Sequence, residues 1–110
     1  MAITNPATLV VIITGCDSGF GSEIAQNLFQ HGGYTIYATC LTEQAVEKYK
    51  ALNSSRFRAI QVDVTNQDDV NRLRVQVEAE CPQGVYCVLN NAGIYAGGFF
   101  DFATEDSFQV

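Results

Sequence analysis

Three glycines within one short run of residues could bind a phosphate group. The run Thr14-Gly15-Cys16-Asp17-Ser18-Gly19-Phe20-Gly21 follows an apolar segment and precedes a helical pattern. In that context Gly15 permits a tight turn, Gly19 lets the backbone approach a pyrophosphate, and Gly21 lets a helix pack closely on a sheet. Amides at the helix start would bind the anion without a side-chain cation. The alternative is a plain strand-to-helix turn, in which three glycines would lower stability for no gain.

Two further groups of polar or small residues follow later apolar segments. Asp63-Val64 ends one segment, and Asn90-Asn91-Ala92-Gly93 follows another. Taken alone, Asp63 is equally compatible with a solvated or capping carboxylate, and the two asparagines are compatible with a turn. No Gly-Lys-Ser/Thr follows the glycines, which excludes a phosphate loop of the NTPase kind. The joint placement of the three groups is what favours a nucleotide site.

Alternating strands and helices must position these groups. The β-branched run over residues 8–14 is continuous, which is typical of a parallel strand covered on both faces. This alternation predicts right-handed βαβ units and therefore an α/β fold with a parallel sheet. Further strands are expected at 34–40, 57–64 and 85–89, and helices at 21–30, at 42–52, from a cap at Thr65 or Asn66 to Pro82, and onward from Thr104.

Together the motifs resemble those of the short-chain dehydrogenases/reductases: Thr-Gly-x-x-x-Gly-x-Gly at 14–21, Asp63-Val64, and Asn90-Asn91-Ala92-Gly93. The glycine run and Ala38-Thr39-Cys40-Leu41-Thr42-Glu43 are similar to the retinol dehydrogenases and related hydroxysteroid dehydrogenases. The resemblance covers essentially the whole chain, but only the first half of such an enzyme. It implies a Rossmann-type sheet of four strands in order 3-2-1-4, half of a doubly wound fold, with residues 1–110 as its dinucleotide-binding portion.

The resemblance also implies roles for individual residues. The backbone around Ser18, Gly19 and Phe20 would hold the pyrophosphate. Asp63 would accept a hydrogen bond from the adenine amino group, and Val64 would bind the ring through its main chain. The asparagines would brace the central strands beside the adenosine ribose, and the residues after them would leave room for the cofactor. The expected cofactor-binding residues are Gly15, Asp17, Ser18, Gly19, Phe20, Gly21, Asp63, Val64, Asn90, Asn91, Ala92 and Gly93.

The resemblance implies hydride transfer between NAD(P) and an alcohol or carbonyl substrate, retinol-like or steroid-like. That chemistry uses a Tyr assisted by a Lys four residues on, with a Ser and an Asn, and no Tyr-x-x-x-Lys occurs in this sequence. We therefore expect no catalytic residue within the 110 residues, since the Asn would fall just beyond Val110. The expected function is the cofactor-binding half of an oxidoreductase. The alternative is a dinucleotide-binding or interaction module without catalysis.

Charge favours NAD over NADP as the cofactor. No Lys or Arg occurs before Lys48, and Asp17 within the glycine run would repel a 2′-phosphate. Against this, the acid expected about 20 residues after the glycines is missing, and Cys40 and Leu41 stand in its place.

Composition bounds the partners and the compartment. A net charge of −6 excludes the basic surface that binds nucleic acid, and no apolar run is long enough for a membrane span. We expect a cytoplasmic protein, because no secretory signal precedes the first strand. The four cysteines form no C-x-x-C pair, so reduced thiols are expected and a metal site is not.

The last expected strand, Val85–Leu89, would have no neighbour on one side. Such an unpaired edge predicts self-association.

Overall fold

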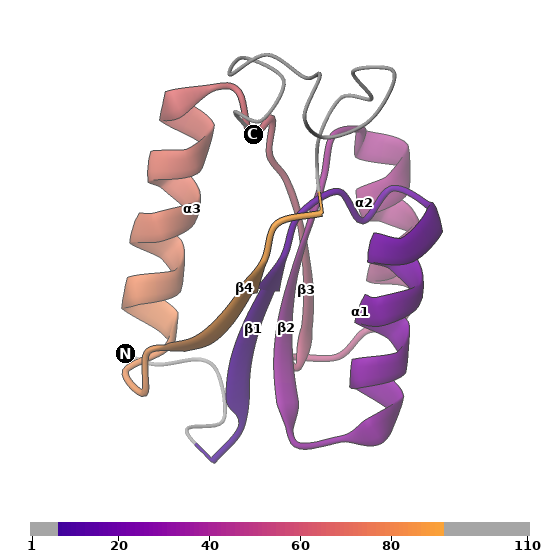
Figure 1. Ribbon diagram of the computed structural model, residues 1–110, viewed down its shortest axis with the longest axis vertical. Helices are drawn as coiled ribbons and strands as arrows, with labels where there is room; N and C mark the ends of the chain where they lie inside the picture. The colour runs from indigo at the N-terminus through magenta and orange to yellow at the C-terminus, as the bar shows by residue number, and fades with distance from the viewer. Residues whose placement is uncertain (1–6, 92–110) are drawn as a thin grey trace, which may run out of the picture.

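The computed structural model describes residues 7–91, which form a parallel sheet with helices on both faces (Figure 1). The strand order is β3-β2-β1-β4, and every pair of neighbouring strands is parallel. The α/β fold and the order 3-2-1-4 predicted from the sequence are thereby confirmed. The elements are β1 (Leu9–Ile13), α1 (Gly19–His31), β2 (Tyr34–Cys40), α2 (Glu43–Lys50), β3 (Phe57–Gln61), α3 (Gln67–Glu80) and β4 (Val85–Leu89).

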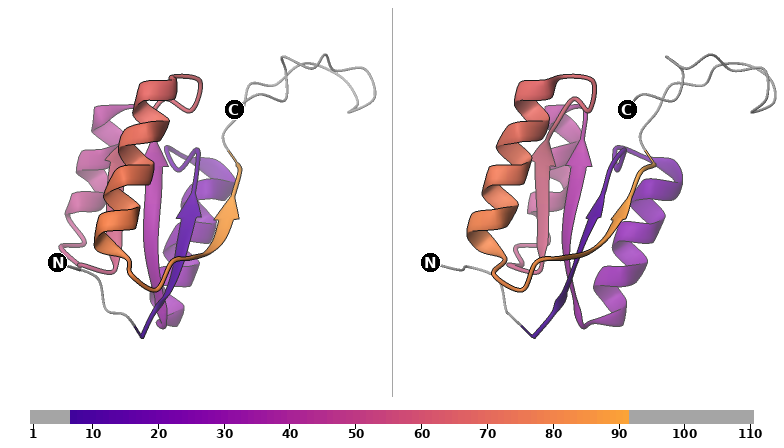
Figure 2. Two further views of the ribbon diagram at one scale, coloured as in Figure 1. Left: turned by 90° about the vertical axis from the view of Figure 1, so that its left-hand side faces the viewer. Right: turned by 60° about the vertical axis from the view of Figure 1, so that its left-hand side comes forward.

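Helices α1 and α2 cover one face of the sheet, and α3 covers the other (Figure 2). Alternate residues of β2 divide between two apolar cores. Ile36 and Ala38 pack with α1 and α2, whereas Tyr37 packs with Leu73 and Val77 of α3. Because both faces of β1 and β2 are buried, their sequences are continuously apolar or β-branched instead of alternating.

Capping side chains fix the starts of α2 and α3. The hydroxyl of Thr42 accepts a hydrogen bond from the amide of Ala45 at 3.3 Å. The side chain of Asn66 accepts one from the amide of Asp69 at 3.1 Å, so Asn66, of the two expected candidates, is the N-cap of α3. Both helices also carry acidic residues in their first turn, where a carboxylate interacts favourably with the helix dipole.

The third strand is shorter than the sequence predicts. β3 ends at Gln61, so Asp63 and Val64 lie in the turn between β3 and α3. Pairing with β2 stops after the amide of Val62, which donates to the carbonyl of Cys40 at 2.9 Å. The helix expected from Thr104, and Ala92 and Gly93 of the expected site, lie outside the described residues.

The turn between β1 and α1 depends on its glycines. Gly15 and Gly19 have φ angles of 70° and 65°, which residues with a side chain rarely adopt. Gly21 has an ordinary φ but no room: a Cβ there would lie 2.4 Å from the carbonyl oxygen of Gly15 and 2.6 Å from Nδ2 of Asn91. The start of α1 therefore packs directly against the end of β1.

Strand β4 pairs with β1 on one side, and within residues 7–91 no strand pairs with its other side. Val85, Tyr86 and Val88 are exposed along this edge. Self-association through the edge stays a prediction. Among the described residues, no helix combines the length and the apolar character that crossing a bilayer requires.

We predict that Gly21→Ala destabilises the fold by about 1–3 kcal/mol, because the added methyl group overlaps backbone atoms that cannot rotate away. The direction of the change in the free energy of unfolding is informative, because replacing a glycine by alanine inside a helix ordinarily stabilises the helix. Urea unfolding followed by circular dichroism measures the change. Asn27→Ala, at an exposed position of the same helix, is the control and should change stability by less than about 0.5 kcal/mol. A Gly21→Ala variant as stable as the parent would contradict the close approach.

A second prediction concerns the four free thiols. Burial, followed by nearby negative charge, raises the pKa of Cys16 and of Cys40 to about 12. Both thiols stay protonated and unreactive at neutral pH, and Cys81 is also buried, whereas Cys87 on β4 is half-buried. Iodoacetamide at about pH 8 should therefore modify Cys87 first in the folded chain, as peptide mass spectrometry would show. Labelling in denaturant is the control, and rapid modification of Cys16 in the folded chain would refute the assignment.

Candidate cofactor-binding site

The polar groups identified in the sequence meet at the carboxyl ends of the strands. The glycine turn follows β1, Leu41 and Thr42 follow β2, Asp63 and Val64 follow β3, and Asn90-Asn91 follows β4. Because all four strands are parallel, these segments lie along the same edge of the sheet (Figure 1). The strand order reverses between β1 and β4, and ligands of open α/β sheets bind at such a switch point.

Helix α1 begins without the features that cap α2 and α3. Its N-cap residue, Ser18, makes no side-chain hydrogen bond to the helix, and the first turn holds no acidic residue. The amides at its start therefore have no side-chain acceptor, and no carboxylate within the first turn offsets the helix dipole. Phe20 is 78% exposed beside them. This end of α1 suits an anionic ligand.

The hydroxyl of Tyr49, on α2, supports the glycine turn. The Tyr49 hydroxyl donates to the carbonyl of Cys16 at 2.6 Å and is hydrogen-bonded to the hydroxyl of Ser22, also at 2.6 Å. Burial raises the pKa of Tyr49, so the phenol keeps its proton at neutral pH. The amide of Cys16 donates to the carbonyl of Thr39 at 2.9 Å. The sequence analysis predicted only a helix over 42–52 and gave Tyr49 no role, so this supporting contact was missed.

Asp17 joins the glycine turn to the loop after β2. Its carboxylate accepts hydrogen bonds from the amide of Leu41 at 2.8 Å, and from the amide and hydroxyl of Thr42 at 3.0 Å each. Partial burial acts to raise the pKa of Asp17, but these hydrogen bonds together lower it. The carboxylate is therefore ionised at neutral pH. It adds a fixed negative charge where strand β2 ends, which is the place where the expected acid is missing.

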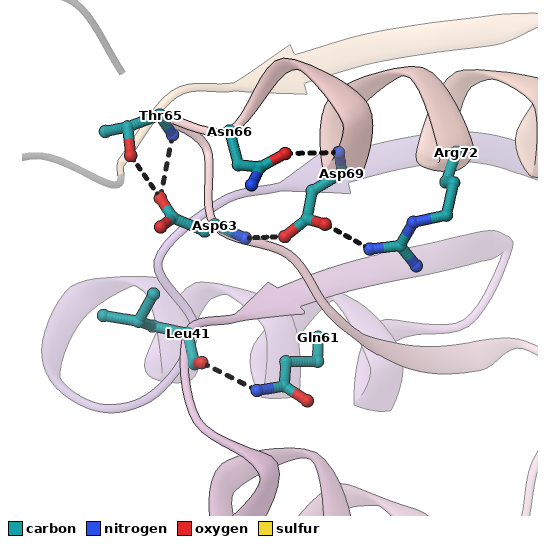
Figure 3. A network of polar contacts seen from close by, with 7 residues as sticks. All are labelled: Leu41, Gln61, Asp63, Thr65, Asn66, Asp69 and Arg72. Carbon is teal, nitrogen blue, oxygen red and sulfur yellow. Dashed lines mark hydrogen bonds and ion pairs between the residues drawn. The ribbon is translucent and has the colours of Figure 1, made fainter.

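Asp63 is held by neighbours on both sides (Figure 3). Its Oδ1 accepts hydrogen bonds from the amide and hydroxyl of Thr65 at 2.9 and 2.6 Å. Its amide donates to Oδ2 of Asp69 at 2.9 Å. The carboxylate thus organises the turn, while its role toward a cofactor stays a prediction. Its second oxygen, Oδ2, accepts no hydrogen bond from any residue between 7 and 91.

The loop after β2 lies beside this turn. Nε2 of Gln61 donates to the carbonyl of Leu41 at 3.2 Å, which ties the two segments together (Figure 3). The side chain of Leu41 is 60% exposed. Leu41 and Asp63 therefore border the same part of the sheet edge, with an apolar surface on one side and an acceptor on the other. The sequence named Leu41 only as a replacement for an acid, because nothing in its pattern shows exposure.

Asn91 connects the ends of β1 and β4. Its amide donates to the Thr14 hydroxyl at 3.0 Å, and its Nδ2 donates to the carbonyl of Gly15 at 3.1 Å. The amide of Thr14 donates to the carbonyl of Leu89 at 3.1 Å. Asn90 instead lines a groove of about 300 Å³ between α3 and the sheet, together with Val64. The two asparagines thus have separate surroundings, and Asn91 is the one that braces the glycine turn.

Comparison with known proteins relates the chain to a family. The sequence model of the short chain dehydrogenases matches residues 9–110. The chain is 38% identical over 86 residues to 17-beta-hydroxysteroid dehydrogenase type 6 of Rattus norvegicus, across 77% of this chain and 27% of the relative. It is 38% identical over 102 residues to retinol dehydrogenase 5 of Homo sapiens, across 90% of this chain and 31% of the relative.

A solved structure has the same arrangement of elements. The short-chain dehydrogenase of Streptomyces avermitilis matches with a TM-score of 0.73 and 29% identity, over 94% of this chain and 38% of that one. The chain spans less than a third of the length of the two curated relatives. The family match confirms the resemblance that the motifs indicated. The chain belongs to the short chain dehydrogenase family of oxidoreductases.

Proposed function

We propose that residues 1–110 are the dinucleotide-binding portion of a short-chain dehydrogenase, and that they bind the cofactor along the carboxyl ends of the strands. One observation carries the proposal. Within the described residues, α1 is the helix that starts with neither a capping side chain nor an acid, and it starts directly after the glycine turn. Dehydrogenases of this family use NAD(P) cofactors.

The pyrophosphate would bind to the amides around Ser18, Gly19 and Phe20. A Cβ built on Gly19 meets nothing within 4 Å, so the space above this residue is open to a ligand. A side chain at this position would fill part of that space, and the φ of 65° would strain it as well. Backbone amides and the positive end of the helix dipole then neutralise the phosphates, with no lysine or arginine required.

The adenosine would lie between the loops after β2 and β3. Leu41 offers an exposed apolar side chain to the adenine ring, and Oδ2 of Asp63 offers an acceptor to its amino group. The main chain of Val64 lies next to that acceptor. Asn91, by bracing the end of β1 against β4, would keep the glycine turn in place beside the ribose.

The ionised Asp17 favours NAD over NADP. Its carboxylate lies against Leu41 and Thr42, at the end of β2, where a bound adenosine ribose would lie. A 2′-phosphate on that ribose would add two negative charges nearby. No lysine or arginine precedes Lys48 in the sequence to offset the repulsion. The hydrogen bonds from Leu41 and Thr42 hold the carboxylate in one place, so its charge is not free to move away.

The whole enzyme would transfer a hydride between the nicotinamide and an alcohol or carbonyl carbon of a retinol-like or steroid-like substrate. The names of the relatives support this substrate class. The residues of this chain bind and orient the cofactor in that reaction. No Tyr-x-x-x-Lys lies within the 110 residues, so the proton transfer requires residues elsewhere in the enzyme. Finding such a segment in the reading frame after Val110 would support this function, and an immediate stop codon would favour a binding module.

We predict that NAD binds more tightly than NADP by about tenfold or more. Isothermal titration of the chain with each nucleotide at moderate salt measures both dissociation constants. Asp17→Asn keeps one of the two oxygens that accept hydrogen bonds from Leu41 and Thr42 but removes the charge, and should reduce the ratio of the NADP to the NAD dissociation constant. Glu23→Gln, an equal charge change at an exposed position of α1, should leave the ratio of the two dissociation constants unchanged. Because hydrogen bonds lower the pKa of Asp17 from 3.8, its carboxylate stays charged throughout the neutral range. The preference should therefore weaken first near about pH 6, where the 2′-phosphate takes up a proton, and not through Asp17. Tighter binding of NADP would sink the proposal.

We also predict that Asp63→Asn weakens NAD binding by about 1–3 kcal/mol, the scale of a lost hydrogen bond to a buried partner. The asparagine keeps Oδ1 as the acceptor for Thr65, and so preserves the turn, but replaces Oδ2 with a donor that cannot accept from an amino group. Titration gives the affinity, and thermal unfolding shows that the fold is kept. Asp68→Asn, in the first turn of α3, is the matched control. Equal NAD affinity in the Asp63→Asn variant and the parent would return Asp63 to a purely structural role.

A further inference from the structure

The amide of Asp63 is bonded by a side chain instead of by a neighbouring strand. Pairing between β3 and β2 ends with the amide of Val62, which donates to the carbonyl of Cys40 at 2.9 Å. The next amide, that of Asp63, donates to Oδ2 of Asp69 at 2.9 Å (Figure 3). Asp69 lies in the first turn of α3. The helix that follows the turn therefore fixes the backbone of the turn itself.

Asp69 is in turn held in one orientation. Its Oδ1 pairs with the guanidinium of Arg72, one turn further along α3. Its own amide donates to the Asn66 side chain at 3.1 Å. The hydrogen bond from Asp63, followed by the pairing with Arg72, lowers the pKa of Asp69. The carboxylate is therefore an ionised acceptor at neutral pH, and a charged acceptor makes a stronger bond to an amide than a neutral one.

Asp68 provides an internal comparison. It lies in the same first turn of α3 and has the same charge, yet it makes no hydrogen bond or ion pair with any residue of the described part of the chain. Attraction to the helix dipole is therefore common to Asp68 and Asp69. Of these two residues, only Asp69 contacts Asp63. A specific function of Asp69 can thus be separated from its general contribution to helix stability.

We propose that Asp69 is a positioning residue for adenine recognition, which holds the backbone of Asp63 so that the Asp63 carboxylate and the Val64 main chain face the adenine ring. The inference rests on the proposed function, because it acts through the adenine contact of Asp63. Thr65 fixes Oδ1 of Asp63 and Asp69 fixes its amide, which leaves Oδ2 as the acceptor for a ligand. Ordering these groups before the ligand arrives removes an entropy cost from binding.

The test compares NAD with nicotinamide hypoxanthine dinucleotide, in which an oxygen replaces the adenine amino group. We expect the parent chain to bind NAD about tenfold more tightly than this analogue. Asp69→Ala should reduce that ratio severalfold, whereas Asp69→Asn, which keeps an oxygen acceptor for the Asp63 amide, should restore much of it. Asp68→Ala should leave the ratio at the parent value. Arg72→Ala, which removes an exposed partner of Asp69, should reduce the ratio to a smaller extent.

The outcomes separate the inference from the proposed function. A parent that binds both nucleotides equally would refute the adenine contact of Asp63. A parent that discriminates, together with Asp69→Ala and Arg72→Ala variants that discriminate equally well, would overturn the positioning role. Equal loss of affinity for both nucleotides would also overturn it, since that result reports a structural effect. Thermal unfolding of each variant identifies a temperature at which all of them are folded, and the titrations are done at that temperature. If Asp69→Ala does not fold, Arg72→Ala, a substitution at an exposed position, still tests the inference.

Discussion

The close approach of α1 to the end of β1 is the constraint on which the site depends. With no side chain at Gly21, the helix begins against the carbonyl of Gly15, and that carbonyl also accepts a hydrogen bond from Asn91. The chain must then reverse within a few residues, which requires the positive φ angles of Gly15 and Gly19. The amides at the helix start are thereby brought to the carboxyl edge of the sheet. The contacts of Tyr49 and Asp17 secure this arrangement from two other elements.

The electrostatics of the edge come from the backbone and from carboxylates. In the described part of the glycine turn and the loop after β2 there is no lysine or arginine. The positive field is that of the helix start, which is directional and short-ranged. Asp17 and Asp63, both bonded to nearby amides, set negative boundaries around it. Under the proposed function, such a site would accept a phosphate only where the amides converge, and it would disfavour additional negative charge on the ribose.

Most of the fold could be predicted from the sequence, because apolar runs, glycines and capping residues are local signals. The continuous run in β1 and the alternation of strands and helices indicated a parallel sheet, and the resemblance of the motifs implied its order. The end of β3 could not be placed, since the amide of Asp63 leaves the sheet for a side chain six residues away. The supporting role of Tyr49 was hidden for a similar reason. Its hydroxyl contacts a turn 33 positions earlier, and no periodic pattern reports such a contact.

The absence of a capping side chain at the start of α1 has a consequence for the lifetime of the protein. Replacing a good N-cap residue ordinarily costs a helix about 1 kcal/mol, and here no side chain supplies that bond. A nucleotide bound at this position, as proposed above, would stabilise the folded chain. At a concentration one hundred times its dissociation constant, a ligand adds about 2.7 kcal/mol to the free energy of unfolding. Proteolysis in a cell follows the population of opened chains, so the abundance of this protein would rise and fall with the supply of its cofactor.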